Sequence, residues 1–432
     1  MTLRLVVLGS ANGSRNLGDE CMWESLVALI RDRFPDSHVT TDGPAGWTPP
    51  FADVAVIPTL AEEMKIDHAR FPRLSELAKT SVTLRGLSRL GRSKRVARLV
   101  ANRLELGPRT PLEMQWHHAI ASSDALIISG AGAMTDQYDV QGIHSWRLLA
   151  GWASSLGKPT LAVGQGVGPV KRHTNRVALK SLLDELDYVG VRDSLSAAYV
   201  RDLGSSPRLL EVTPDWASAM SPTAASLEVA DELIGQWGVR EGFVAVSLHL
   251  HEPLAFRRRW LLQRLAKALV QTANRHNLPM VFVPNMTGAR HSDDRTLAQS
   301  VISRLPSALR SRCHVHVGRS DATVVASILS RSRGIVSTRY HPLVFALGVG
   351  RPAIGIYFDE YYRRKLEGAS AHFGVSGNVF AAELVWTQPE KVFIELAVQR
   401  VSVANPIPIA ERLMYNVEPF LSRIQEERTK RE

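Results

Sequence analysis

A repeated order of short apolar strand, glycine-rich turn and helix constrains this chain more than any other feature. It occurs where "LRLVVLG" leads into "SANGSRNLGDE" and "CMWESLVALIRDRF", and again around "ALIISG", "PTLAVGQGVGP" and "YVGVRDS". These strands are apolar throughout instead of alternating, which is typical of a parallel sheet covered on both faces. The order returns in "GFVAVSLHLH", "LPMVFVPNM", "HVHVG", "RGIVSTR" and "RPAIGIYF". The sequence therefore predicts doubly wound α/β architecture.

The length of the chain predicts more than one domain. Its 432 residues exceed what one hydrophobic core usually supports, so two domains of roughly 150 to 220 residues are expected. The small, polar stretch "ASAMSPTAASLEV" indicates a boundary near residue 220. We predict Rossmann-like domains over residues 1–220 and 221–385, facing each other across a cleft, and a helical tail over 386–432. Ligands of such sheets bind at the carboxyl ends of the strands.

The charge balance predicts an anionic partner. The chain has 52 Lys and Arg against 42 Asp and Glu, a net charge of +10, and an excess of this size attracts anions. The sequence shows no zinc-finger spacing, no helix-turn-helix pattern and no interleaving of aromatic and basic residues, so a nucleic-acid partner is not predicted. A small, multiply charged substrate and an anionic membrane surface both fit.

Cysteine usage and hydropathy predict a cytoplasmic protein. Cys21 and Cys313 are the only cysteines, which argues against a disulfide framework and suits a reducing compartment. No stretch reaches the roughly 18 uninterrupted apolar residues of a membrane-spanning helix. The first residues, "MTLRLVVLGS", resemble a buried strand more than a secretion signal.

One segment, residues 85–109, is strongly basic. It holds eight Lys and Arg against the single acid Glu105, and its Leu and Val residues recur at near-helical spacing. This pattern predicts a basic amphipathic helix. Two interpretations remain open: the apolar stripe packs on the first domain, or the helix makes peripheral contact with an anionic membrane at its inner face.

The string "IVSTRYHPLVFALGVGRPAIG" carries the sharpest chemical signal. A strand ends, Arg339, Tyr340 and His341 follow, and a helix begins with Pro342 in its first turn. Arg offers a rigid fork of donors for a carboxylate or phosphate, and His can hold or give a proton near neutral pH. Arg339 could instead be a salt-bridge partner and His341 a helix-capping side chain.

The glycine-rich turns "GSANGSRNLGDE" and "SGAGAMTDQ" are further potential anion sites, because helix N-termini favour negative charge.

Six segments, in this order, resemble the polysaccharide pyruvyl transferase family. They are "GSRNLGDE", "SGAGAMTDQ", "LGKPTLAVGQGVGPV", "VGVRDSLS", "VTPDWA" and "STRYHPLVFALGVGRPAIGIYFDE". The resemblance spans residues 9 to about 365. It implies two Rossmann-like domains similar to those of two-domain GT-B glycosyltransferases, and transfer of a pyruvyl group from phosphoenolpyruvate to two hydroxyls of a sugar. The products are a cyclic ketal and free phosphate.

The resemblance also implies roles for particular residues. Arg192 and Arg339 correspond to arginines that bind the donor, Tyr340 and Lys365 lie beside that site, and His341 corresponds to the histidine that acts as an acid or binds the departing phosphate. The residues implied on the acceptor side or in the cleft are Asn16, Asp19, Asp136, Asp215, His249 and His291. Phosphoenolpyruvate and a glycan or lipid-linked saccharide are the expected partners, with no cofactor.

The sequence departs from the family pattern at three places. Tyr340 stands where many members have Leu, and "SLHLH" stands where they often have Arg, so that His249 or His251 takes this position. Lys365, in "YFDEYYRRKLEG", has only loosely the family spacing. "HLH" and "HVH" place paired His on one face of a strand as metal ligands would lie, but no metal site is predicted.

Two other function classes remain open at this point. The same fold could bind a nucleotide sugar and transfer the sugar itself, as a GT-B-type glycosyltransferase does. The chain could also be a binding module that has lost the reaction, although Arg192, Arg339 and His341 are all present.

Overall fold

The computed structural model describes residues 2–9, 12–60, 108, 110–136, 141–250, 255–288, 293–318, 321–388 and 406–429. His291 and, apart from residue 108, the basic segment 85–109 lie outside these residues. Every described helix is too short or too polar to cross a bilayer.

Two compact units make up the chain. The N-terminal unit comprises residues 1–13, 26–213 and 416–432, and the C-terminal unit comprises residues 14–25 and 214–415. Helix α1 (Leu17–Arg33) is therefore divided, with its first turns belonging to the C-terminal unit.

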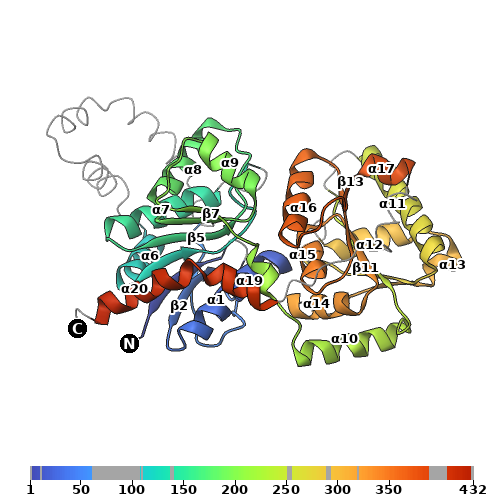
Figure 1. The fold of residues 1–432 in the computed structure, drawn as a ribbon, viewed down its shortest axis with the longest axis horizontal. Coiled ribbons are helices and arrows are strands. Elements are labelled where there is room, and N and C mark those ends of the chain that lie inside the picture. Colours follow the sequence, from blue (N-terminus) through green and yellow to red (C-terminus); the bar gives the residue numbers. More distant parts are fainter. Residues whose placement is uncertain are drawn as a thin grey trace. The chain divides into compact units, whose positions relative to one another are not determined.

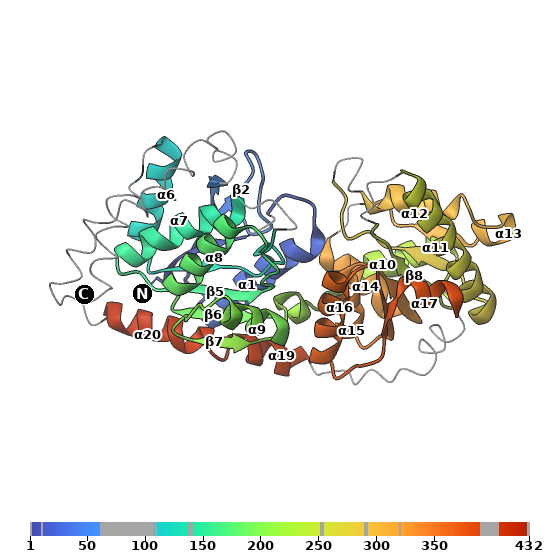
Figure 2. The same cartoon turned by 90° about the horizontal axis from the view of Figure 1, so that it is seen from above.

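A seven-stranded sheet forms the centre of the N-terminal unit. Its order is β3-β2-β1-β4-β5-β6-β7, and all neighbouring strands are parallel. The strands are β1 (Arg4–Leu8), β2 (His38–Gly43), β3 (Ala55–Pro58), β4 (Ala125–Ile128), β5 (Thr160–Gln165), β6 (Tyr188–Val191) and β7 (Leu210–Val212). Helices α7 (Gln141–Ser155) and α8 (His173–Glu185) cover one face, and α1 and α20 (Val417–Thr429) cover the other (Figures 1 and 2). Helices α6 (Pro111–Ser122) and α9 (Ser194–Asp202) complete this unit.

A six-stranded sheet forms the centre of the C-terminal unit. Its order is β10-β9-β8-β11-β12-β13, again parallel throughout. The strands are β8 (Val244–Ser247), β9 (Met280–Phe282), β10 (Cys313–Val315), β11 (Gly334–Ser337), β12 (Ala353–Tyr357) and β13 (Val379–Ala381). The helices are η2 (Trp216–Ala219), α10 (Ala224–Trp237), α11 (Ala255–His276), α12 (Asp294–Ile302), α13 (Ser307–Arg310), α14 (Ala322–Arg331), α15 (Tyr340–Gly348), α16 (Glu360–His372), α17 (Ala382–Thr387) and α19 (Pro406–Met414).

The predicted fold class is confirmed, because both sheets are parallel and alternate with helices along the chain. Helix α15, which follows the "STRYH" turn, is buried from Tyr340 to Leu347. A helix that is apolar all round belongs in a core, and this one lies at the centre of its unit, against β11, β12 and α14. Its first residues are therefore held by packing on several sides.

We expect the core of the N-terminal unit to be sensitive to cavities on α8. Leu179 is fully buried and packs in this core, whereas Val177 on the same helix is 55% exposed. Leu179→Ala should lower the free energy of unfolding by about 2–5 kcal/mol, measured by urea denaturation. Val177→Ala, the matched control, should change it by no more than about 0.5 kcal/mol. Equal effects would show that this helix does not pack as described.

Candidate active site

The "STRYH" turn lies at the carboxyl edge of the C-terminal sheet. Strand β11 ends at Ser337, and Arg339 occupies the position before α15 with extended backbone (φ −98°, ψ 143°). Its side chain does not cap the helix. The Arg339 and His341 side chains are only 12% and 7% exposed. Both groups are therefore withdrawn from bulk water. Electrostatic interactions are stronger in this buried environment than in water.

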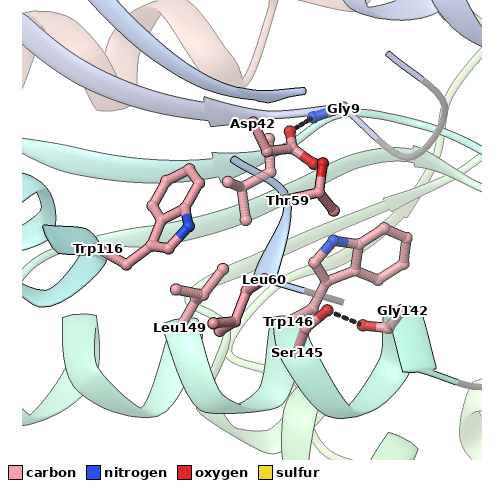
Figure 3. Close-up of a pocket in the computed structure, with 10 residues that line it drawn as sticks. Gly9, Asp42, Thr59, Leu60, Trp116, Gly142, Ser145, Trp146 and Leu149 are labelled. Atoms are coloured by element: carbon pink, nitrogen blue, oxygen red, sulfur yellow. Dashed lines mark hydrogen bonds between the residues drawn. The ribbon is translucent and has the colours of Figure 1, made fainter. Parts of the chain in front are cut away.

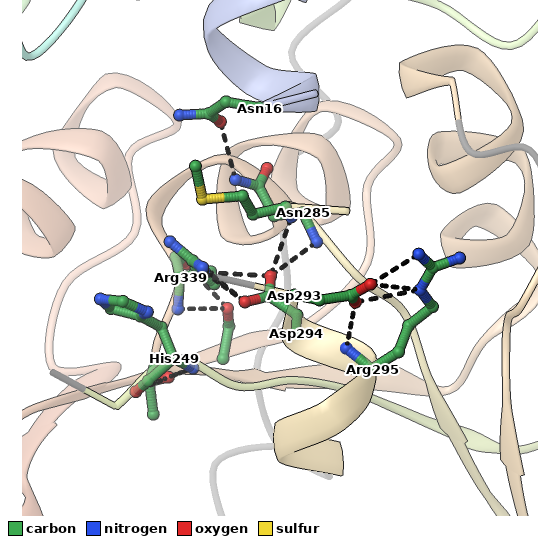
Figure 4. A network of polar contacts seen from close by, with 10 residues as sticks. Asn16, His249, Asn285, Asp293, Asp294, Arg295 and Arg339 are labelled. Carbon is green, nitrogen blue, oxygen red and sulfur yellow. Dashed lines mark hydrogen bonds and ion pairs between the residues drawn. The ribbon is translucent and has the colours of Figure 1, made fainter. Parts of the chain in front are cut away.

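Arg339 is held by a buried carboxylate. Its Nε donates to both oxygens of Asp294 at 3.2 and 3.1 Å, and its Nη2 donates to Oδ1. Asp294 is the first residue of α12 and is 5% exposed. Its Oδ2 also accepts the backbone N–H groups of Asn285 and Met286, each at 2.9 Å (Figure 4). These bonds hold the carboxylate in one position, which fixes the orientation of the guanidinium.

The start of α1 joins this network through amide side chains. Asn285 Nδ2 donates to Asn16 Oδ1 at 3.0 Å (Figure 4). Asn16 Nδ2 in turn donates to Asp19 Oδ2 at 2.6 Å. The backbones pair as well, since Leu17 N–H donates to the Asn285 carbonyl at 2.9 Å. The "NLGDE" motif is therefore anchored to the loop that follows β9.

Asp19 leads from this network to His341. The Asp19 Oδ1 and His341 Nε2 atoms are 3.6 Å apart, which is ion-pair distance but longer than a hydrogen bond. A Cβ added to Gly18 would lie 1.8 Å from His341 Cγ, so the imidazole lies directly on the backbone of α1. Tyr340 meets the same ring edge-on at 4.9 Å between centroids. Arg339 and His341 are thus the two ends of one chain of contacts.

A second basic group lies beside Tyr340. Lys365, on α16, places its Nζ 5.4 Å from the centre of the Tyr340 ring and 4.9 Å from that of Tyr361. The Nζ also donates to the Tyr361 hydroxyl at 3.1 Å. A cation over an aromatic face is stabilised electrostatically. The structure therefore brings Lys365 to the start of α15, despite its loose sequence spacing.

Two further predicted residues belong to the C-terminal unit. His249 follows β8, the strand next to β11, and its carbonyl accepts the Thr338 hydroxyl at 2.9 Å. Asp215 is 2% exposed and caps η2, where its Oδ1 accepts the Ala217 N–H at 2.9 Å. Both residues support local structure.

Arg192 and Asp136 lie in the N-terminal unit. Arg192 follows β6 and is 2% exposed, with its guanidinium so close to Gly166 that a Cβ there would lie 2.7 Å from Nη2. Asp136 accepts the Arg172 N–H at 2.7 Å and the Asn175 amide at 2.6 Å, just before α8. Burial alone would raise the pKa of Asp136, but these bonds outweigh it and lower the pKa. Asp136 thus has a capping position.

The N-terminal unit also contains a small pocket around a buried carboxyl. It has a volume of about 50 Å³, room for a few water-sized groups and not for a sugar ring. Asp42 lines it and accepts the Gly9 N–H at 2.7 Å, and Thr59 and Trp146 lie nearby (Figure 3). Burial raises the pKa of Asp42 to about 7, against the effect of its backbone hydrogen bonds. The carboxyl can therefore exchange a proton near neutral pH.

The described residues hold no group of three or more His, Cys, Asp or Glu side chains that could bind a metal ion.

The sequence comparison assigns a family: residues 16–360 match the polysaccharide pyruvyl transferases, which is more than half of the chain. The protein belongs to the polysaccharide pyruvyl transferase family. The match begins at Asn16 and ends at Glu360, so it includes both ends of the Arg339–His341 network and stops short of Lys365. None of the curated proteins matches the sequence.

Solved structures show the same fold at low sequence identity. UDP-GlcNAc 2-epimerase of Methanocaldococcus jannaschii is 11% identical, with a TM-score of 0.55 over 97% of this chain and 99% of that one. MnaA of S. aureus, solved with UDP, is 11% identical, with a TM-score of 0.54 over 97% of each chain. α,α-Trehalose 6-phosphate synthase of Burkholderia multivorans is 12% identical, with a TM-score of 0.51 over 100% and 98%. The GT-B-like fold of this pyruvyl transferase family member is thus confirmed.

Sequence reasoning missed two members of the site. Asn285 connects the start of α1 with Asp294, and Gly18 lets α1 approach His341. The polar residues directly after the "MVFVP" strand were the available signal, because side chains at the carboxyl ends of parallel strands converge.

Gly18→Ala should displace the His341 imidazole, because the new Cβ would overlap the ring. We expect a changed His341 ring resonance in NMR spectra and a destabilised C-terminal unit. Gly348→Ala on α15 is the matched control, since its nearest neighbour would lie at 3.9 Å. If the Gly18 variant left the His341 resonance unchanged, this contact would be wrong.

Asp42 should make stability fall as the pH rises from about 4 to about 7. In this window the folded chain keeps a proton on Asp42 that the unfolded chain releases, because the pKa is raised from 3.8 to about 7. Asp42→Asn keeps an acceptor for Gly9 N–H and should flatten this dependence, measured by urea unfolding across the pH range. Asp36→Asn, an exposed control, should leave it unchanged. An unaltered profile in Asp42→Asn would refute a protonated Asp42.

Proposed function

We propose that this protein transfers the pyruvyl group of phosphoenolpyruvate to two hydroxyls of a sugar in a polysaccharide, a glycolipid or their precursor. The family membership supports a pyruvyl donor and a sugar acceptor. The observation that carries the proposal further is the network that holds Arg339 and His341 at the start of α15. It presents an oriented guanidinium and an imidazole at one turn.

Arg339 is suited to bind the anionic donor. Phosphoenolpyruvate carries a phosphate and a carboxylate on three carbons and needs several cations at short range. A guanidinium has five N–H donors, and Asp294 engages those on Nε and Nη2. Among the described residues, Nη1 makes no hydrogen bond, so its two N–H donors can bind an anion. We propose Arg192, Tyr340 and Lys365 as further donor-binding residues.

The reaction requires a proton at the donor's methylene carbon. Protonation converts the methylene to a methyl group and leaves the central carbon cation-like, so that one sugar hydroxyl can add to it. The C–O bond to phosphate then breaks, and the second hydroxyl closes the ketal. One hydroxyl proton balances the new methyl C–H bond and the other leaves with phosphate. His341 is our candidate for the acid, or for the group that binds the departing phosphate.

Asp19 supports either role for His341. Its Oδ1 lies 3.6 Å from His341 Nε2, so the carboxylate can orient the imidazole. Asp19 is itself oriented by Asn16 at 2.6 Å. Asp19 therefore acts as a positioning residue in this proposal.

The acceptor side is proposed over residues 1–220, the donor side over 221–385, and a helical tail over 386–432. The residues proposed on the acceptor side or in the cleft are Asn16, Asp19, Asp136, Asp215, His249 and His291. We also propose that the protein is cytoplasmic, and that residues 85–109 contact an anionic membrane.

Arg339→Lys should weaken phosphoenolpyruvate binding by roughly 10- to 100-fold, because Lys keeps the charge and loses the fork. Titration calorimetry measures this without an acceptor. His341→Gln should slow phosphate release with a glycan extract by about 10²- to 10⁴-fold. An acid role for His341 predicts nearly intact binding of phosphoenolpyruvate in this variant, and a phosphate-binding role predicts weaker binding.

Arg351→Lys is the control for the arginine exchange, since its guanidinium bonds the Ser330 carbonyl in another part of the unit. Circular dichroism checks that each variant is folded. The proposal fails if wild-type protein binds a nucleotide sugar and not phosphoenolpyruvate, which would indicate a glycosyltransferase instead.

A further inference from the structure

Helix α11 of the C-terminal unit has an unusual charge composition. Over residues 255–272 it contains no Asp or Glu and five cationic residues, which are Arg257, Arg258, Arg259, Arg264 and Lys267. Most helices mix both signs on the exposed side, which limits their long-range field. On this helix, all charged side chains over residues 255–272 are positive.

Two large aromatic side chains lie exposed on the same helix. Phe256 is 72% exposed and Trp260, one turn later, is 46% exposed. Residues four apart lie on one face of a helix, and the exposed Gln263 and Lys267 continue that face. The opposite face is occupied, because Leu261, Leu262 and Leu269 pack in the core. The aromatic face is therefore not part of the interior of its unit.

Neighbouring side chains hold Trp260 in place. Its ring meets Trp386 of α17 edge-on, with 5.0 Å between centroids, and the Arg264 guanidinium lies 5.1 Å from its centre. Figures 1 and 2 both place α17 beside α11. Glu383, on α17, is exposed as well. An indole held at the surface loses little conformational freedom when it is buried by a partner.

Helix α11 begins near the candidate active site. Its first residue follows β8 after a short connection, and β8 ends at the carboxyl edge where His249 and the "STRYH" turn lie. A partner that covers Phe256 and Trp260 would therefore lie next to the edge of the sheet that carries Arg339 and His341.

We propose that this face of α11 docks on an anionic lipid bilayer. Lys and Arg are attracted to negatively charged headgroups, and Trp and Phe insert at the boundary between headgroups and acyl chains. The exposed aromatic pair and the surrounding cations supply both contributions on one helix. The face is distinct from residues 85–109 and belongs to the other unit. Together with the proposed function, the docking would bring a lipid-linked saccharide to the Arg339–His341 edge.

Charge and shape favour a lipid surface over a nucleic acid or a second protein. Phe256 and Trp260 lie in line with the helix axis, so both can enter a flat interface at once. No hollow is required for this contact. An acidic protein or an RNA would satisfy the cations alone, and these partners are the competing outcomes of the test.

Vesicle co-sedimentation of the full chain tests the proposal without any substrate. Wild-type protein should bind vesicles of equal phosphatidylcholine and phosphatidylglycerol much more strongly than pure phosphatidylcholine vesicles. Arg257→Gln/Arg259→Gln/Lys267→Gln should lower the partition coefficient by on the order of 100-fold, because each cation near the surface contributes about fivefold. Phe256→Ser/Trp260→Ser should lower it by at least about tenfold.

A matched triple variant, Arg201→Gln/Arg208→Gln/Arg240→Gln, removes the same charge from exposed positions on other elements. It should retain most of the binding, and circular dichroism should show all variants folded. Equal loss in this control and in the α11 variants would overturn the proposal. So would wild-type binding to RNA but not to vesicles, or a dimer in solution that Phe256→Ser/Trp260→Ser dissolves. Phosphoenolpyruvate binding in the α11 variants should stay at the wild-type level, which separates this test from that of the proposed function.

Discussion

The buried ion pair of Arg339 and Asp294 is the interaction on which the candidate site depends. A buried carboxylate is costly unless it is paired and hydrogen-bonded, and Asp294 receives three N–H groups besides Nη2 of Arg339. The same carboxylate orders the loop after β9, because the N–H donors of Asn285 and Met286 converge on it. Breaking the pair would therefore release the guanidinium and this loop together.

The loop in turn determines where α1 begins. Its Asn285 bonds Asn16 through the side chain and Leu17 through the backbone, so the first turn of α1 belongs to the C-terminal unit although it follows the first strand of the other sheet. Gly18 then allows the helix to lie on the imidazole of His341. The "NLGDE" and "STRYH" motifs, more than 300 residues apart, are thus two sides of one packed arrangement.

The parallel architecture was predictable because its strands are continuous apolar runs, and β1, β4, β8 and β11 are fully or almost fully buried. Sequence reasoning missed β2, β3, β7 and β13, none of which is buried throughout. β2 contains "HVTTDG", and β7 has no buried residue, so neither stands out from a loop. Side-chain pairing was less predictable, since the Asn16–Asn285 contact depends on tertiary structure. In the turn before α1, which the sequence indicates as a potential anion site, Glu20 accepts the Arg15 N–H at 2.9 Å, and this pairing also depends on the fold of the turn.

The departure at Tyr340 explains a second difference from the family pattern. A Leu at this position could pack against α16 but could not attract an ammonium group. The Tyr340 ring centre instead lies 5.4 Å from the Nζ of Lys365. The same Nζ donates a hydrogen bond to the Tyr361 hydroxyl at 3.1 Å. Cation–π attraction of this kind is worth about 0.5–2 kcal/mol, enough to restrain a flexible Lys side chain. The loose spacing of Lys365 in the sequence is therefore compensated by an aromatic residue on the facing helix, and the two departures are one structural feature.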